Sequence, residues 1–137
     1  MLTLEAGPLP VSDIDRALAF YTEQAGFNLD VDYRLSPAFR VVQLTPPGSA
    51  CSVQLVAAAS SDRVRNLYLV TDDLEAERRK LISRGVAVGK MRHKSPVEAW
   101  AGGWSEGLDP QRRDYASFAH FADPDGNTWT LQERGHV

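Results

Sequence analysis

The first clear pattern in the chain is a helical spacing of apolar residues between residues 12 and 26. Ser12 or Asp13 can cap the start of a helix, because a short polar side chain accepts hydrogen bonds from the free backbone N–H groups there. Gly26 is suited to end the helix. Between them, apolar residues follow the repeat of one helix face: Ile14, Ala17, Leu18, Tyr21 and Ala25. The pattern predicts an amphipathic helix.

Short apolar or alternating runs on both sides of this helix predict strands. Pro8 and Pro10 place the first strand at a sheet edge or at a barrel seam, because proline lacks the N–H that a neighbouring strand would bind. The strands predicted in this half cover residues 2–11, 27–34, 39–45 and 51–57, with a turn at 46–49. The first half therefore has the predicted order βαβββ.

The same pattern starts again 59 residues later, where Val70-Thr71-Asp72 repeats Val11-Ser12-Asp13 and Gly85 repeats Gly26. The second half predicts a helix over 72–85 and strands over 66–72, 86–92, 114–122 and 127–134, with a turn at Asp123–Gly126. We therefore expect two βαβββ modules, residues 1–60 and 64–135. A long insert at 94–114 is the main difference between them, and a loop of that length is usually functional or mobile.

The composition fits one folded domain of 137 residues. With 15 Lys and Arg against 18 Asp and Glu, the net charge is -3, which offers no basic surface for nucleic acid or an anionic membrane. The single cysteine, Cys51, cannot form an internal disulfide and indicates a reducing cytoplasm. The sequence shows no secretory leader and no apolar run long enough to cross a membrane, so we expect neither secretion nor membrane insertion.

Three motifs in this order resemble the vicinal oxygen chelate superfamily, which includes glyoxalase I, fosfomycin resistance proteins, extradiol dioxygenases and bleomycin resistance proteins. The motifs are PVSDIDRALAFYTEQAGF, VTDDLEAERRKLISRGV and FADPDGNTWTLQE, and the resemblance spans nearly the whole chain. It implies an α+β fold in which two βαβββ modules form a curled mixed sheet, the glyoxalase/bleomycin resistance/dihydroxybiphenyl dioxygenase fold. It also implies a homodimer, because paired modules would cover the edges of an open sheet.

The metal-dependent members of this superfamily hold a divalent ion with inward-facing His and Glu side chains from four strands. The resemblance assigns those four positions to Ala6, Gln54, Asn66 and Thr130. None of the four supplies a charged or imidazole donor, so we expect no metal and no other cofactor. The metal-dependent chemistry of glyoxalase I and the dioxygenases is not expected, and a site with relocated ligands such as His93 and His120 is a minor alternative.

With the cleft geometry that the resemblance implies, strand alternation predicts that eight side chains line the cleft: Ala6, Pro8, Ser52, Gln54, Asn66, Tyr68, Thr130 and Gln132. The similarity to the fosfomycin resistance proteins implies two more lining residues, Phe118 and His120. This cleft is predicted to be polar and nearly uncharged, with the basic run 90–94 left as a solvated strand end. The amides of Gln54, Asn66 and Gln132 would either bind a planar polar ligand or satisfy one another.

Two residues of the cleft are candidates for catalysis. His120 is the inward group that titrates near neutral pH, which suits a general acid or base, a ligand contact or a hydrogen-bonded structural role. Tyr68 could orient a carbonyl or phenol, or simply pack. In the insert, Trp100 and Trp104 are spaced so that a helical turn would align both indoles, either to stack on a flat ligand or to cover a dimer seam or sheet edge.

These residues leave two functions open. The first is metal-free binding of a small molecule, an antibiotic or aromatic secondary metabolite, in the manner of bleomycin resistance proteins. The second is a metal-independent lyase, isomerase or cyclase acting on a secondary metabolite, with His120 as acid or base and Tyr68 or Gln54 polarising a carbonyl.

Overall fold

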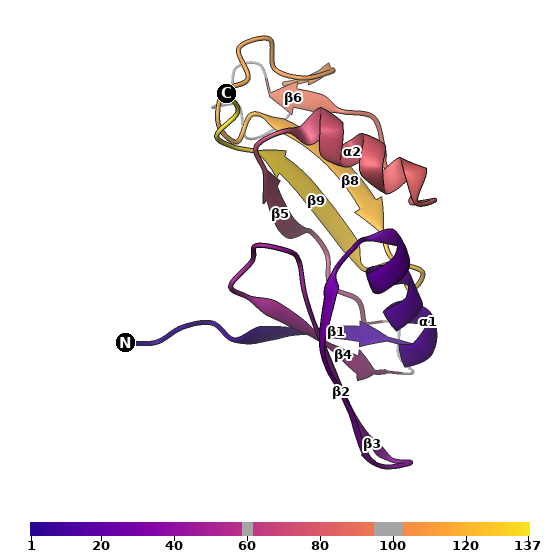
Figure 1. Ribbon diagram of the computed structural model, residues 1–137. Coiled ribbons are helices and arrows are strands. Elements are labelled where there is room, and N and C mark those ends of the chain that lie inside the picture. The colour runs from indigo at the N-terminus through magenta and orange to yellow at the C-terminus, as the bar shows by residue number, and fades with distance from the viewer. Residues whose placement is uncertain (59–61, 95–102) are drawn as a thin grey trace. The chain divides into compact units, whose positions relative to one another are not determined.

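The computed structural model describes residues 1–58, 62–94 and 103–137 of the chain. Its elements follow the order β1 (Ala6–Val11), α1 (Ile14–Ala19), a π-helical turn η1 (Phe20–Gln24), β2 (Asn28–Ser36), β3 (Phe39–Thr45), β4 (Ser52–Ala57), β5 (Leu67–Thr71), α2 (Leu74–Ser83), β6 (Arg92–Lys94), β7 (Trp104–Glu106), β8 (Ser117–Ala122) and β9 (Thr128–Glu133) (Figure 1). They form two compact units. The predicted α+β class with two related modules is confirmed.

The first unit consists of residues 1–64 together with the turn 123–127. Its sheet has the order β1-β4-β3-β2, so the proline-bearing strand β1 lies at an edge, as predicted. Strand β1 runs parallel to β4, whereas β2, β3 and β4 are antiparallel neighbours. Helix α1 packs against β4, and the core beneath it is formed by buried side chains: Leu9, Val11, Ala17, Tyr21, Val42, Leu44 and Leu55.

The predicted first helix forms and Gly26 ends it as expected, but its last turn is π-helical. Asp13 is the N-cap, and its carboxylate accepts a hydrogen bond from the backbone N–H of Arg16. After Ala19 the helix widens into η1, where the N–H of Ala25 donates to the carbonyl of Phe20 at 2.9 Å. Gly26 then adopts a φ of 80°, a left-handed conformation that ends the helix at little steric cost.

The turn Asp123–Gly126 holds the start of the first unit in place. The carboxylate of Asp125 accepts hydrogen bonds from the backbone and hydroxyl of Ser12 and from Arg16. The carboxylate of Asp123 accepts from the Tyr21 hydroxyl at 2.7 Å, and this contact is buried. The Asp-rich motif is therefore a docking element for α1 as well as a turn.

The second unit consists of residues 65–122 and 128–137, and its sheet has the order β5-β9-β8-β6-β7. Helix α2 packs against β8 and β9, and Figure 1 shows it lying across them. Beneath the helix, the rings of Phe121 and Trp129 are stacked with centroids 6.2 Å apart. Among the described residues, none of the helices is long and apolar enough to span a bilayer.

A buried ion pair fixes the start of α2 to the end of β9. Glu133 has no exposed surface, and its carboxylate accepts both a hydrogen bond from the backbone N–H of Leu74 and two from the Arg112 guanidinium at 2.7 Å. Burial opposes the charge of Glu133, but these hydrogen bonds outweigh it and hold the pKa of the carboxyl below its usual value.

Two predictions about the second half were wrong in detail. Residues 86–91 form no strand, and β6 instead covers Arg92–Lys94. The basic run is not a solvated strand end, because His93 and Lys94 are both buried. The predicted insert 94–114 contains a strand of its own, β7, which pairs with β6 and extends the sheet by one strand.

Candidate functional site

The side of the second sheet that faces away from α2 carries most of the predicted site residues. Glu133 reaches the start of α2, so alternate residues of β9, among them Thr130 and Gln132, project to the other side. Residues paired across neighbouring strands project to the same side. This side, which we call the distal face, carries Tyr68, Val70, Arg92, Lys94, Trp104, Glu106, Phe118, His120, Thr130 and Gln132.

His120 lies at the centre of a hydrogen-bond chain on the distal face. Its Nε2 is 2.9 Å from Nη2 of Arg92, and its Nδ1 is 3.0 Å from the hydroxyl of Thr130. A guanidinium can only donate, so Nε2 must accept and Nδ1 carries the proton. The Thr130 hydroxyl in turn donates to the side-chain oxygen of Asn66 at 3.3 Å. Each group of this hydrogen-bond chain, from the Arg92 guanidinium to the Asn66 amide, thus has a consistent donor or acceptor role.

This environment keeps His120 neutral. Burial lowers the pKa of the imidazole below its usual value of 6.5, and the charge of Arg92 lowers it further. Protonation would place a second cation within hydrogen-bond distance of the guanidinium. A neutral imidazole with both ring nitrogens engaged has no free lone pair with which to abstract a proton from a ligand.

Aromatic and cationic side chains lie together beside His120. The rings of Trp104 and Phe118 make an edge-to-face contact with centroids 5.1 Å apart. The guanidinium of Arg92 lies 4.1 Å, and the ammonium of Lys94 4.3 Å, from the centre of the Trp104 ring. The prediction of a nearly uncharged lining was therefore wrong, because strand β6 brings two cations onto the same face as His120.

A cavity of about 440 Å³ opens in the second unit next to this network. Its size falls within the range of about 300–1,000 Å³ that is common for small-molecule sites. Its lining includes His120, Arg92 and Asn66 from the hydrogen-bond chain, together with Arg65, Phe121, Ala122 and Thr128. Asn66 adopts a φ of 60°, a conformation that asparagine tolerates better than most residues, and its backbone N–H donates to the Thr128 hydroxyl.

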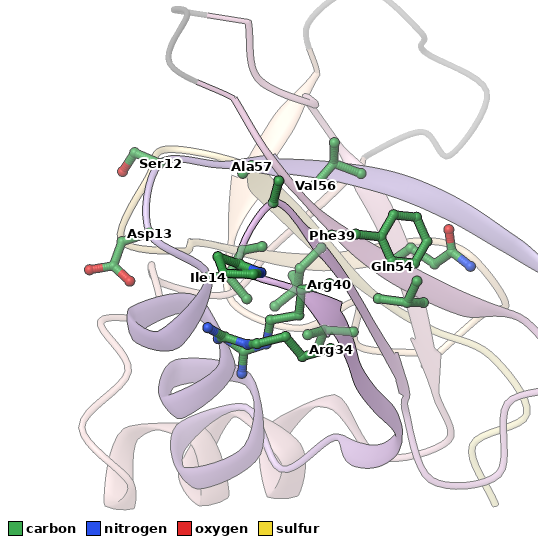
Figure 2. A pocket seen from close by; sticks show the side chains of 14 residues that line it. Ser12, Asp13, Ile14, Arg34, Phe39, Arg40, Gln54, Val56 and Ala57 are labelled. Atoms are coloured by element: carbon green, nitrogen blue, oxygen red, sulfur yellow. The ribbon is translucent and has the colours of Figure 1, made fainter.

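The first unit has a larger cavity, of about 640 Å³. It lies where β3 and β4 stop pairing, beyond Val42 and Leu55. Figure 2 shows Arg34 and Arg40 extending together on one side of these strands, with Gln54 on the other. Arg40 is paired with two carboxylates, those of Asp15 and Asp32.

The predicted amide residues are mostly satisfied by the protein itself. Gln54 donates to the side-chain oxygen of Gln43 at 3.0 Å, and Gln43 donates in turn to Glu5. Gln132 donates to the backbone carbonyl of Tyr115 at 3.3 Å. Tyr68, by contrast, has 61% of its surface exposed at the edge strand β5.

The residues at the family's four metal-ligand positions do not fit a divalent ion. The side chains of Asn66 and Thr130 are hydrogen-bonded to each other, and Gln54 is hydrogen-bonded to the amide of Gln43. The methyl side chain of Ala6 has no atom that could bind a metal. Within the part of the chain that the structure describes, no three His, Cys, Asp or Glu side chains are grouped so that they could hold a metal. No chemical step is therefore assigned to a metal here.

Of the two tryptophans predicted for the insert, Trp100 lies outside the described residues. Trp104 belongs to strand β7 and is therefore not part of the predicted helical turn. Arg92 and Lys94 were missed as site residues because residues 90–94 were interpreted as a solvated strand end. The pairing of Arg92 with Phe118 places Arg92 on the face that Phe118 shares, and strand alternation places Lys94 on the same side.

The comparisons with known proteins agree with this architecture. The model of the Glyoxalase/Bleomycin resistance protein/Dioxygenase superfamily matches residues 3–131. An uncharacterized protein of Shewanella frigidimarina (strain NCIMB 400) is 30% identical over 135 residues, covering 90% of this chain and 87% of the relative.

Two solved structures are similar over almost their full length. The structure of TnmS3, an antibiotic binding protein from Streptomyces sp. CB03234, is 30% identical with a TM-score of 0.72, and the match covers 98% of each chain. A member of the same superfamily from Sphaerobacter thermophilus DSM 20745 is 26% identical with a TM-score of 0.71, again covering 98% of each chain.

Proposed function

The chain belongs to the glyoxalase/bleomycin resistance protein/dioxygenase superfamily, and we propose that within it this protein binds a small aromatic molecule without converting it. An antibiotic or an aromatic secondary metabolite is the ligand class that we infer. The observation that carries this proposal is the state of His120, whose two ring nitrogens are both engaged by protein groups.

The surroundings of His120 support binding rather than catalysis. A general base needs a free nitrogen near the substrate, and here Nε2 would have to give up its hydrogen bond from Arg92. The neighbouring Trp104 and Phe118 rings instead offer apolar surface to a flat ligand. The similarity to TnmS3, which is described as an antibiotic binding protein, supports the same class of function.

The competing function is a metal-independent lyase, isomerase or cyclase in which His120 exchanges a proton with the substrate and Tyr68 polarises a carbonyl. That role requires a ligand to displace Arg92 from the imidazole and so release Nε2. The two functions differ in what happens to the ligand, which makes them separable by chemical analysis.

The test is a binding and recovery experiment. The purified protein is screened by thermal shift against aromatic polyketide antibiotics, first after treatment with EDTA and then with added nickel, zinc or manganese. Ligands that raise the melting temperature are incubated with an excess of protein, extracted and analysed by mass spectrometry and NMR. We expect at least one ligand to stabilise the protein, to do so equally without metal, and to be recovered unchanged.

Conversion of a bound ligand to a new product that is slowed in His120→Asn would overturn the binding function in favour of the enzyme. Stabilisation by a divalent metal alone, by several degrees, would overturn the metal-free site. A screen in which no aromatic compound shifts the melting temperature would reject the proposed ligand class.

A further inference from the structure

We infer that the cavity of the second unit selects an acidic aromatic ligand, one whose carboxylate or phenolate is held by Arg92 and Arg65. This inference rests on the proposed binding function and adds to it the charge of the ligand. The starting observation is that the seven residues that line this cavity include two arginines and no carboxylate.

Neither arginine is neutralised by the part of the chain that the structure describes. Among those residues, no carboxylate lies within ion-pair distance of Arg65 or Arg92. Glu106 is the cross-strand neighbour of Arg92 on β7, but the two do not form an ion pair. The contacts of Arg92 are instead a neutral imidazole and the ring of Trp104, and neither of them cancels its charge.

Several other arginines form ion pairs with carboxylates. Arg40 in the first unit is paired with Asp15 and Asp32, and these hydrogen bonds raise the pKa of its guanidinium above its usual value. Arg113 is paired with the buried carboxylate of Asp109 at 2.9 Å. Among the described residues, Arg92 therefore differs from Arg40 and Arg113 in having no carboxylate within ion-pair distance.

The geometry of Arg92 leaves donors for an anion. A guanidinium has five N–H groups. One of the two N–H groups of Nη2 is used by His120, and the planar group lies over the Trp104 ring. The other N–H of Nη2 is parallel to an N–H of a neighbouring nitrogen, so a carboxylate can accept from these two while the hydrogen bond to His120 stays in place. The ammonium of Lys94, which lies over the same indole, adds positive charge to this side of the face.

The test compares two probes that share one ring system. Anthracene-2-carboxylate is negatively charged at neutral pH, and anthracene-2-carboxamide is its neutral counterpart of nearly equal shape. Their dissociation constants are measured by isothermal titration calorimetry at pH 7.5 with the wild-type protein, Arg92→Gln, Arg65→Gln and Arg79→Gln. Arg79 is the matched control, since it lies on α2 and pairs with Glu75 on the surface.

We expect the wild-type protein to bind the carboxylate at least about tenfold more tightly than the carboxamide, as charge-assisted hydrogen bonds are about twice as strong as neutral ones. Arg92→Gln should weaken the binding of the carboxylate probe alone and so reduce the preference to within about twofold. Arg65→Gln should reduce the preference partly. Raising the salt concentration should also reduce it, since the contact is electrostatic. Arg79→Gln should keep the preference.

The outcomes separate the inference from the function on which it rests. Equal affinity of the two probes for the wild-type protein, or a preference that persists in Arg92→Gln, overturns the charge selection and leaves aromatic binding standing. Failure of both probes to bind overturns the two together. Circular dichroism and thermal unfolding of each variant establish that a lost preference does not come from a lost fold.

Discussion

Trp104 offers the most direct measure of how much of the ligand affinity comes from stacking. The side chain keeps 39% of its surface accessible, which corresponds to about 100 Å² if a whole tryptophan exposes about 250 Å². At about 25 cal/mol per Å², full coverage of this surface is worth about 2.5 kcal/mol, and coverage of half of it is worth about 1.2 kcal/mol. Trp104→Ala should therefore weaken the binding of a flat aromatic ligand about 7- to 60-fold.

The assay is calorimetric titration with anthracene-2-carboxylate, because fluorescence would report on the residue that is being removed. Trp104→Phe should recover part of the affinity, since a smaller ring still contacts Phe118 and the ligand. Ile82→Ala is the control, because Ile82 is a similarly exposed apolar residue on α2, away from the distal face. Binding by Trp104→Ala within twofold of the wild-type protein would show that the distal face at β7 is not the binding surface.

Three further predictions follow from the ion pairs, the imidazole and the sheet edges. Because the pKa of His120 is lowered on folding, the unfolded state binds more protons than the folded state below pH 6.5, so the stability should fall as the pH drops. His120→Asn should lessen that fall, measured by thermal unfolding between pH 7.5 and 5. Glu133→Gln should lower the free energy of unfolding by about 3 kcal/mol in urea titrations, because it leaves the half-buried guanidinium of Arg112 without its counter-charge. Glu75→Gln on the surface should change the free energy of unfolding by less than about 0.5 kcal/mol. The protein should form a homodimer, and light scattering at micromolar concentration that detects only monomer would contradict this expectation.

The elements that could be predicted from sequence are those specified by local signals. The N-cap at Asp13, the glycine after the first helix and the two prolines of β1 each act within a few residues, and the structure has the helix and the edge strand that they predict. The π-helical turn at Phe20–Gln24 could not be predicted, because its wider hydrogen bonds depend on how Tyr21 packs and reaches the turn at Asp123.

The charge of the candidate site was missed for a different reason. Whether Arg92 points to solvent or onto the distal face depends on the register between β6 and β8, and that pairing joins residues far apart in the sequence. The residues 86–91 are apolar enough to suggest a strand, but they contribute none. The positions of Tyr68 and Thr130 on one face, by contrast, follow from simple alternation in strands that were located correctly, and that of His120 follows from the family resemblance.

The uncharged side chains at the family's metal positions and the two arginines of the cavity affect the electrostatics of the second unit in the same direction. In a metal site, imidazole and carboxylate ligands surround a cation, so additional cations nearby are unfavourable. Here Asn66 and Thr130 carry no charge, and the cavity beside them presents Arg65 and Arg92 without a carboxylate in its lining. In the function that we propose, the guanidinium that makes His120 a poor base also attracts an acidic ligand, and it can do both at once because the imidazole uses only one of its five N–H groups. The uncharged side chains at the metal positions and the two arginines of the cavity lining therefore support the same proposal, the binding of an acidic organic molecule.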